Sequence, residues 1–353
     1  MGDKGEGLGG GGGADVLSSP FDVPHMKMGQ VFQGPHPVTS LDFHEAGELC
    51  VTANSDNSVT LINAVEGKIR KLAHSRKYGA GVVKYTHHEQ SVLLTSNGTN
   101  GDHAIRYLSL YDHAFVRFFE GHTDKVISIA MSPTNDQFMS GSTDRSVRLW
   151  DLSSPKCLAV LQFPLNSGAP HVAFDPQGLV FAATASIGAA NIIKLYDARN
   201  YQRGPFDTFD LEHDKVTDFL VNRHPHIQSQ QAQTLARARW TNLKFSVDGK
   251  SILVSTDANL AIAVDAFECQ VSQVFTGHAN DNGSDLDACF TPDGKYVLSG
   301  SEDSTIYVWH AETGELATTL KGHAGAVGRV ACSPKFEVMA SACMNTALWI
   351  RQP

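Results

Sequence analysis

Residues 142–151 read STDRSVRLWD, and residues 301–310 read SEDSTIYVWH. Each segment begins with a turn of small and acidic residues and continues as an alternating strand that reaches a tryptophan near its end. Weaker copies of the pattern end at Asn63, Asp112, Asp197, Asp265 and Ile350. Seven units recur in this way, and the ends of neighbouring units are 39 to 68 residues apart. A repeat of that length is typical of stacked supersecondary units rather than of separate domains.

Glycine–histidine pairs precede the best copies, at residues 121–122, 277–278 and 322–323. Between the turns, apolar and polar residues alternate, as in VTSLDF at residues 38–43, which is the pattern of half-buried strands. Gly-His with Asp and Trp at fixed offsets is typical of WD repeats. The sequence therefore predicts an all-β fold, a seven-bladed WD-repeat β-propeller in which each blade is a four-stranded antiparallel sheet.

Two histidines in these repeats are expected to have a structural role rather than a catalytic one. Each should bond to the tight-turn aspartate of its own blade, and a strand serine or threonine should link the chain onward to the tryptophan. Such a network satisfies polar groups that would otherwise be costly to bury between blades. The predicted structural network consists of His122, Asp144, Trp150, His278, Asp303 and Trp309.

The last repeat ends after its third strand, at residues 347–351, so its outer strand is expected to come from elsewhere in the chain. Residues 28–33, which read MGQVFQ, are predicted to supply that strand and close the ring, removing two open sheet edges. Residues 1–27 include an unbroken glycine run and are predicted to form a disordered tail, because they cannot bury enough apolar surface. The propeller is assigned to residues 28–353.

One interval between repeats is longer than the others. The 68 residues from Asp197 to Asp265 contain an insertion at about 211–239, which we expect to be a long surface loop that is partly disordered. The insertion holds several histidines and a glutamine-rich stretch at 228–233. The insertion has no cysteine, and its histidines and acidic residues do not recur at a metal-ligand spacing, so no metal site is predicted.

The composition limits the classes of partner. Hydrophobic residues make up 42% and charged residues 18% of the chain, which is typical of a globular protein. The net charge of −9 argues against binding nucleic acid by phosphate neutralisation. A basic cluster at residues 68–77 is interpreted as the charged edge of an outer strand. No window of 18 apolar residues exists, so no membrane span is expected.

Catalytic motifs are missing from the sequence. It contains no G-x-S-x-G or HExxH motif, and the glycine run at 9–13 neither follows a strand nor opens a helix. The six cysteines are scattered and are expected to be reduced thiols. We therefore predict that the protein is not an enzyme and needs no cofactor.

Several strings outside the WD positions resemble one family, the WD-repeat-containing protein 82 family, whose members are the Swd-type subunits of the COMPASS histone-lysine methyltransferase. The resemblance runs from about residue 31 to 349. The strings that carry it lie at residues 77–79, 105–112, 204–206, 241–246, 265–267 and 340–343. It implies a non-enzymatic scaffold in the nucleus that supports histone lysine methylation and is linked to the phosphorylated tail of RNA polymerase II.

The resemblance also implies alternative assemblies. Members of the family serve complexes with a type-one protein phosphatase and its nuclear targeting subunit, and complexes for cleavage and polyadenylation. A generic adaptor of another complex stays open as well. The tail and the insertion depart from the family pattern, which leaves the partner set undecided.

The binding residues are expected where loops gather at one end of the ring. A phosphorylated peptide would be recognised by arginine and lysine with an aromatic ring beside them. Residues next to the tight turns or before an innermost strand, and residues near the junction of the first two blades, meet this description. The predicted peptide- or protein-binding residues are Lys77, Tyr78, Arg106, Tyr107, Lys125, Thr143, Arg145 and Glu302.

Overall fold

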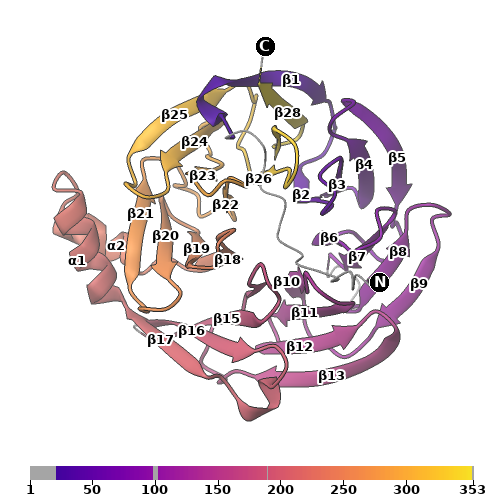
Figure 1. The fold of residues 1–353 in the computed structure, drawn as a ribbon, viewed down its shortest axis with the longest axis horizontal. Coiled ribbons are helices and arrows are strands. Elements are labelled where there is room, and N and C mark those ends of the chain that lie inside the picture. The colour runs from indigo at the N-terminus through magenta and orange to yellow at the C-terminus, as the bar shows by residue number, and fades with distance from the viewer. Residues whose placement is uncertain (1–20, 98–101, 189, 352–353) are drawn as a thin grey trace, which may run out of the picture.

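A computed structural model describes residues 21–97, 102–188 and 190–351 of the 353-residue chain. In these residues the strands form seven four-stranded antiparallel sheets, arranged as blades around a central axis (Figure 1). Each blade begins with its innermost strand and ends with its outermost one. The predicted seven-bladed propeller is confirmed.

The strands of the first four blades follow the chain in order. Blade 1 holds β2 (Val38–Phe43), β3 (Leu49–Asn54), β4 (Ser58–Asn63) and β5 (Lys68–His74), and blade 2 holds β6 (Val83–Tyr85), β7 (Ser91–Thr95), β8 (Ile105–Ser109) and β9 (Phe115–Phe119). Blade 3 holds β10 (Val126–Met131), β11 (Gln137–Ser142), β12 (Ser146–Asp151) and β13 (Ser154–Gln162), and blade 4 holds β14 (Val172–Phe174), β15 (Val180–Ile187), β16 (Ala190–Asp197) and β17 (Asp207–Glu212).

The remaining blades complete the ring. Blade 5 holds β18 (Trp240–Phe245), β19 (Ser251–Thr256), β20 (Leu260–Asp265) and β21 (Val271–Thr276), and blade 6 holds β22 (Ala288–Phe290), β23 (Tyr296–Ser299), β24 (Thr305–His310) and β25 (Leu316–Lys321). Blade 7 holds β26 (Arg329–Cys332), β27 (Val338–Ala342), β28 (Thr346–Arg351) and β1 (Met26–Phe32), and two 3-10 turns, η1 (Val23–His25) and η2 (Tyr201–Arg203), lie outside the sheets.

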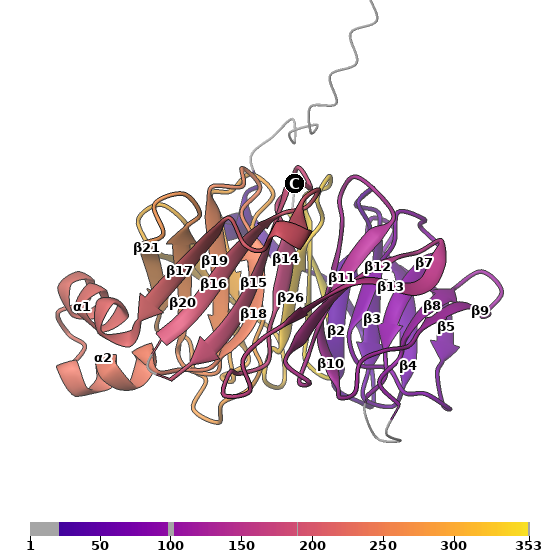
Figure 2. The same cartoon turned by 90° about the horizontal axis from the view of Figure 1, so that it is seen from below.

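The strands run between two faces of the ring, which Figure 2 shows edge-on. The Lys125 face carries the connections into each innermost strand and the turns between second and third strands, such as residues 120–125 and 143–145. The Phe206 face carries the hairpin turns between first and second strands and between third and fourth strands, such as residues 175–179 and 198–206.

The hydrophobic core lies between neighbouring blades. Phe119, Phe138 and Trp150 are buried together with Leu93 of blade 2. The ring of Phe119 lies edge-on to Phe138, with 4.8 Å between centroids, and edge-on to Trp150, with 5.7 Å between centroids. Aromatic pairs in this geometry stabilise a core beyond the burial of their surface. Blades 2 and 3 therefore share one core, which holds the loops on both faces in fixed positions.

The N-terminal strand closes the ring as predicted. Strand β1 pairs with β28 in antiparallel register, with Met28 opposite Trp349 and Phe32 opposite Thr346. The sheet order of blade 7 is β1-β28-β27-β26, so the first strand of the chain is the outer strand of the last blade (Figure 1).

The predicted boundary of the tail at residue 27 is wrong. Residues 21–27 belong to the fold, because Phe21, Val23 and Met26 are buried in the same cluster as Trp349. The backbone N–H of Phe21 also donates to Asp293, at 3.0 Å. These apolar residues follow a glycine-rich stretch. The prediction treated the whole segment by its average composition, which is that of the glycine-rich part. The rest of the predicted tail, residues 1–20, lies outside the described residues.

The insertion is a helical hairpin and not the loop that the sequence suggested. Helix α1 (His213–Arg223) and helix α2 (Ser229–Ala236) follow β17, and α1 contacts β17 and β21 beside blades 4 and 5 (Figure 1). Val216 and Leu220 are buried and stand four residues apart, on one face of α1. That short apolar stripe sits in an otherwise polar segment, which explains why the sequence pattern missed it. Neither helix is long and apolar enough to cross a membrane.

Candidate functional site

Blade 3 contains the predicted network as a closed chain of hydrogen bonds. The Nδ1 of His122 donates to Oδ2 of Asp144 at 2.8 Å, and Nε2 accepts from Oγ of Ser140 at 2.7 Å. The same hydroxyl oxygen accepts from the indole Nε1 of Trp150 at 2.8 Å. Asp144 further accepts from Ser146 Oγ at 2.6 Å. The prediction for His122, Asp144 and Trp150 is therefore correct in its geometry.

The charge state of this chain follows from its surroundings. Burial lowers the pKa of His122, against the opposing effect of Asp144, so the imidazole is held neutral. Burial alone would raise the pKa of Asp144, but hydrogen bonds from Ser146, His122 and the Thr123 N–H bring it down to about 2. The pair is a neutral histidine that donates to a carboxylate, with each polar atom already used within the blade.

Blade 6 does not form the predicted network. Asp303 accepts from the Tyr307 hydroxyl at 2.9 Å, and Nδ1 of His278 has no hydrogen-bond partner within the described residues. The indole of Trp309 donates to the Thr276 carbonyl at 3.1 Å. Ser299 is equivalent to Ser140 of blade 3. Its hydroxyl donates to the Gly300 carbonyl at 3.0 Å and therefore does not connect His278 to Trp309.

Blade 7 forms another His–Ser–Trp hydrogen-bond chain, which the sequence did not predict. Nε2 of His323 contacts Oγ of Ser341 at 2.6 Å, and Trp349 donates to the same oxygen at 2.7 Å. In place of an aspartate, the thiol of Cys343 lies 3.1 Å from Nδ1 of His323. The Gly-His pair and the tryptophan were visible in the sequence, but the tight turn is two residues shorter than in blade 3. Because of this shorter turn, the spacing seen in blade 3 does not identify Cys343 as the partner of His323.

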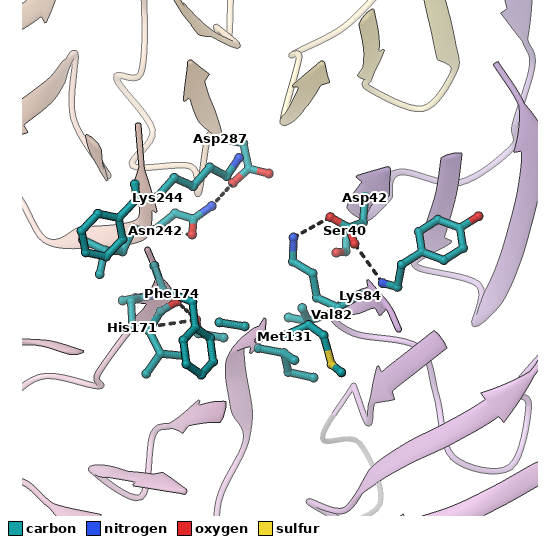
Figure 3. A pocket seen from close by; sticks show the side chains of 18 of the residues that line it. Ser40, Asp42, Val82, Lys84, Met131, His171, Phe174, Asn242, Lys244 and Asp287 are labelled. Atoms are coloured by element: carbon teal, nitrogen blue, oxygen red, sulfur yellow. Dashed lines mark hydrogen bonds and ion pairs between the residues drawn. The ribbon is translucent and has the colours of Figure 1, made fainter. Parts of the chain in front are cut away.

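A cavity of about 640 Å³ occupies the centre of the ring and is lined by residues of the innermost strands (Figure 3). On one wall, Nζ of Lys84 lies 2.7 Å from Oδ1 of Asp42, whose other oxygen accepts from the Tyr85 N–H at 2.9 Å. On the other wall, Nδ2 of Asn242 donates to Oδ1 of Asp287 at 2.6 Å.

The charges along this cavity are paired. Burial would lower the pKa of Lys84, but Asp42 and, more weakly, Asp287 raise it above its usual value. Burial would raise the pKa of Asp287, but Lys244, Arg329 and the Asn242 hydrogen bond lower it. Figure 3 shows Lys244 extending toward Asp287. The wall of the cavity therefore carries ammonium and carboxylate groups whose charges are paired with one another. Such a lining favours a polar ligand over an apolar one.

None of the eight predicted binding residues lines this cavity. The residues that do, such as Asp42, Lys84 and Lys244, were missed. Their only signal is a polar residue inside an otherwise apolar innermost strand, as in VTSLDF at 38–43.

The structure brings three of the predicted residues together. The guanidinium of Arg106 lies 4.0 Å from the ring centroid of Tyr78, and Nζ of Lys77 lies 4.8 Å from the same ring. Arg106 is 0% exposed and forms an ion pair with Asp102. It therefore supports the Tyr78 ring from below, while Lys77 is exposed. The hydroxyl of Tyr107, on the same strand, accepts from Ser91 at 3.4 Å.

The other predicted residues lie on the Lys125 face in two separate places. In blade 3, Lys125 is exposed, and its carbonyl accepts from the Thr143 hydroxyl at 3.1 Å. Arg145 follows in the same turn with a positive φ of 63°. In blade 6, Glu302 accepts from Ser284 Oγ at 2.5 Å and from the Asn282 side chain at 2.9 Å, and so orders the loop before β22.

Three cations of the basic cluster, Lys68, Arg70 and Lys71, lie on β5, the outermost strand of blade 1, whereas Arg76 and Lys77 follow it in the connection to β6. Lys68 and Arg70 both pair with Glu66, at 3.9 and 2.6 Å. Nζ of Lys71 donates to the carbonyls of Leu110 and Tyr111, at 2.9 and 2.5 Å. These three cations form the charged strand edge that the sequence suggested and are engaged within the protein, while the last two residues of the cluster lie beyond the strand.

The seven blades, the buried His–Ser–Trp chains and the closing strand define a WD-repeat β-propeller, and the WD domain, G-beta repeat family matches residues 26–63, 114–151 and 269–310. The chain is 38% identical to WD repeat-containing protein 82 of Drosophila melanogaster, over 93% of this chain and 95% of that one. It is 33% identical to the Set1 complex component swd2 of Schizosaccharomyces pombe (84% and 76% covered) and to the COMPASS component SWD2 of Saccharomyces cerevisiae (78% and 76%). The chain therefore belongs to the WD repeat-containing protein 82 and Swd2 family.

Proposed function

We propose that this protein is a non-catalytic WD-repeat subunit of a nuclear COMPASS-type histone-lysine methyltransferase complex. The observation that carries the proposal is similarity along nearly the whole chain to WD repeat-containing protein 82, together with the similarity to subunits of the Set1 and COMPASS complexes.

The role is proposed to be binding rather than catalysis. The histidine of blade 3 is neutral and already donates to Asp144. The described residues contain no group of three or more side chains suited to hold a metal ion. A rigid ring with fixed loops is suited to hold other proteins in place.

The Lys125 face is proposed as the site for a phosphorylated peptide, such as the phosphorylated tail of RNA polymerase II. Lys77 and Lys125 are exposed, and Tyr78 offers a ring beside Lys77. Cations next to an aromatic ring provide charge-assisted hydrogen bonds and packing to a phosphorylated segment. Arg106 would act indirectly, by holding the Tyr78 ring.

Affinity purification of the tagged full chain from nuclear extract, followed by mass spectrometry, tests the proposed assembly. We expect recovery of the catalytic subunit of a histone-lysine methyltransferase. Recovery of only a type-one phosphatase with its targeting subunit, or only of cleavage and polyadenylation factors, would replace the proposal by the corresponding alternative.

A matched pair of variants tests the peptide site. Lys77→Glu with Lys125→Glu should weaken binding of a phosphoserine peptide from the polymerase tail at least tenfold in fluorescence anisotropy. The control is Lys156→Glu, an exposed lysine of the outer strand β13. Equal binding by both proteins would remove the Lys125 face as the peptide site.

A further inference from the structure

Two cysteines lie side by side where blade 6 meets blade 7, and the proposed function uses neither of them. Cys289 is on β22 and Cys332 is on β26, the innermost strands of the two blades. Both side chains pack in the hydrophobic cluster that contains Trp349. All six cysteines of the chain are free thiols in the structure. This pair is therefore available for thiol chemistry.

The register of the strands explains why the two side chains meet. Cys289 of blade 6 stands at the position that Asp42 occupies in blade 1. Cys332 of blade 7 stands at the position that Tyr85 occupies in blade 2. Oδ2 of Asp42 accepts from the Tyr85 N–H at 2.9 Å, so a side chain at this position reaches the next blade. In the same way, the sulfur of Cys289 accepts hydrogen bonds from the thiol and the N–H of Cys332.

Polar contacts hold the beginnings of the two strands together. The N–H of Asp287 donates to the Gly328 carbonyl at 3.0 Å. Nε of Arg329 lies 3.9 Å from the Asp287 carboxylate. A disulfide forms without strain only where two backbones are already held close to each other. These contacts provide that arrangement at the junction of blades 6 and 7.

The surroundings make the two thiols unequal. The hydrogen bond from Cys332 and the positive charge of Lys244 lower the pKa of Cys289, against the effects of burial and of Asp287. The same hydrogen bond and burial raise the pKa of Cys332. The thiolate is the form of cysteine that attacks an oxidant. Cys289 is therefore the first nucleophile, and Cys332 is the thiol placed to react with it afterwards.

The central cavity gives a small molecule access to the pair. Cys289 is 6% exposed, and Cys332 is partly exposed. Lys244 and Asp287 line the cavity, as does Arg329 on the same strand as Cys332 (Figure 3). This polar lining admits hydrogen peroxide more readily than an apolar reagent.

We propose that Cys289 and Cys332 form a reversible disulfide when hydrogen peroxide enters the central cavity. The Cys289 thiolate attacks one peroxide oxygen, the O–O bond breaks, and the departing hydroxide takes up the thiol proton to leave as water. Sγ of Cys332 then attacks the resulting sulfenic acid on Cys289, the S–O bond breaks, and a second water leaves. Two thiols and one peroxide thus give one disulfide and two waters, and the two electrons lost by the thiols reduce the peroxide.

The disulfide joins blade 6 to blade 7, the blade that the N-terminal strand completes. A dithiol reductant restores both thiols by exchange. The inference goes beyond the proposed function, because it concerns the ring itself and holds for any complex that the protein serves.

Peptide mapping of the full chain tests the bond directly. The reduced protein is treated with hydrogen peroxide at neutral pH, blocked with N-ethylmaleimide and digested with trypsin in the absence of reductant. Cys269→Ser is present throughout, because Cys269 and Cys289 both lie on the tryptic peptide 251–295. We expect this peptide to be linked to the peptide 330–335, which contains Cys332, and a dithiol reductant to separate them.

Cys157 is the internal control, because it is a partly exposed thiol on the outer strand β13. If exposure alone decided the reaction, Cys157 would be oxidised before the buried Cys289. We expect most of the chain to carry the 289–332 bond while Cys157 still reacts with N-ethylmaleimide. Oxidation of Cys157 at an equal or lower peroxide dose would overturn the proposal, as would the absence of the linked peptides.

Two single substitutions test the order of the steps, with circular dichroism confirming the fold of each variant. In Cys332→Ser, the sulfenic acid on Cys289 has no second thiol to attack it, so dimedone should label Cys289. In Cys289→Ser, Cys332 should stay reduced at the same peroxide dose. Equal labelling by dimedone in the two variants would contradict the role of Cys289 as the first nucleophile.

Discussion

The indole Nε1 of Trp150 donates to the hydroxyl oxygen of Ser140 at 2.8 Å, in a position where both side chains are fully buried. The same hydroxyl bonds His122, so a single small side chain satisfies polar atoms of two larger ones. A buried polar group without a partner is costly, and this serine therefore matters more than its size suggests.

Ser140→Ala should destabilise the protein by about 2–4 kcal/mol, because it leaves Nε1 of Trp150 and Nε2 of His122 buried and unpaired. The midpoint of urea denaturation, followed by tryptophan fluorescence, measures the loss. The matched control is Ser299→Ala, since among the described residues that hydroxyl bonds only the neighbouring Gly300 carbonyl. Similar losses for the two variants would contradict the role assigned to Ser140.

Stability should fall as the pH drops from 7 to 5. Burial lowers the pKa of both His171 and His278 to about 4, so each is neutral when folded and protonated when unfolded over this range. The unfolded state binds more protons, and the free energy of unfolding therefore rises with pH. Each histidine should contribute about 2 kcal/mol of the loss at pH 5.

The test compares urea denaturation at pH 7 and pH 5. His278→Gln should show a smaller pH-dependent loss than the unmodified chain, whatever its absolute stability. His226→Gln, an exposed position on the helical hairpin, should keep the full loss. An unchanged pH dependence in His278→Gln would mean that this histidine is not held neutral by the fold.

The repeats predicted the fold because their residue types recur at fixed offsets. His122, Asp144 and Trp150 could be joined from the sequence alone, since each has one suitable partner at the expected distance. The same offsets failed in blade 6, where Tyr307 binds Asp303 and the Ser299 hydroxyl turns away. The rotamer of Ser299 and the competing hydroxyl of Tyr307 decide whether the network forms, and the repeat pattern of the sequence shows neither of them.

The contact surfaces were less predictable than the ring. Asp42 and Lys84 face the cavity, but a period of two shows only that alternate residues share a side of the strand. It does not show whether that side meets the axis or the next blade.

Phe21 should be essential for closing the ring. Its side chain is 1% exposed and packs in the cluster that includes Trp349 and Met26. Phe21→Ala should lower the free energy of unfolding by about 3–5 kcal/mol, since it leaves a cavity beside the closing strand. Lys27→Ala, an exposed position on β1, should cost less than about 0.5 kcal/mol. Equal effects in thermal denaturation would show that residues before β1 do not contribute to closure.

The helical hairpin should be a packed part of blades 4 and 5. Leu220 is 0% exposed and belongs to the cluster that contains Val254 and Val274 of blade 5. Leu220→Ala should therefore cost about 2–4 kcal/mol and raise amide hydrogen exchange in α1 and β21 together. Asn222→Ala, on the exposed side of α1, should change neither quantity. If Leu220→Ala raised exchange only within α1 and α2, the hairpin would be an appendage that the propeller does not need. A shared effect on β21 would instead show that the insertion completes the outer wall between these two blades, where α1 contacts both β17 and β21.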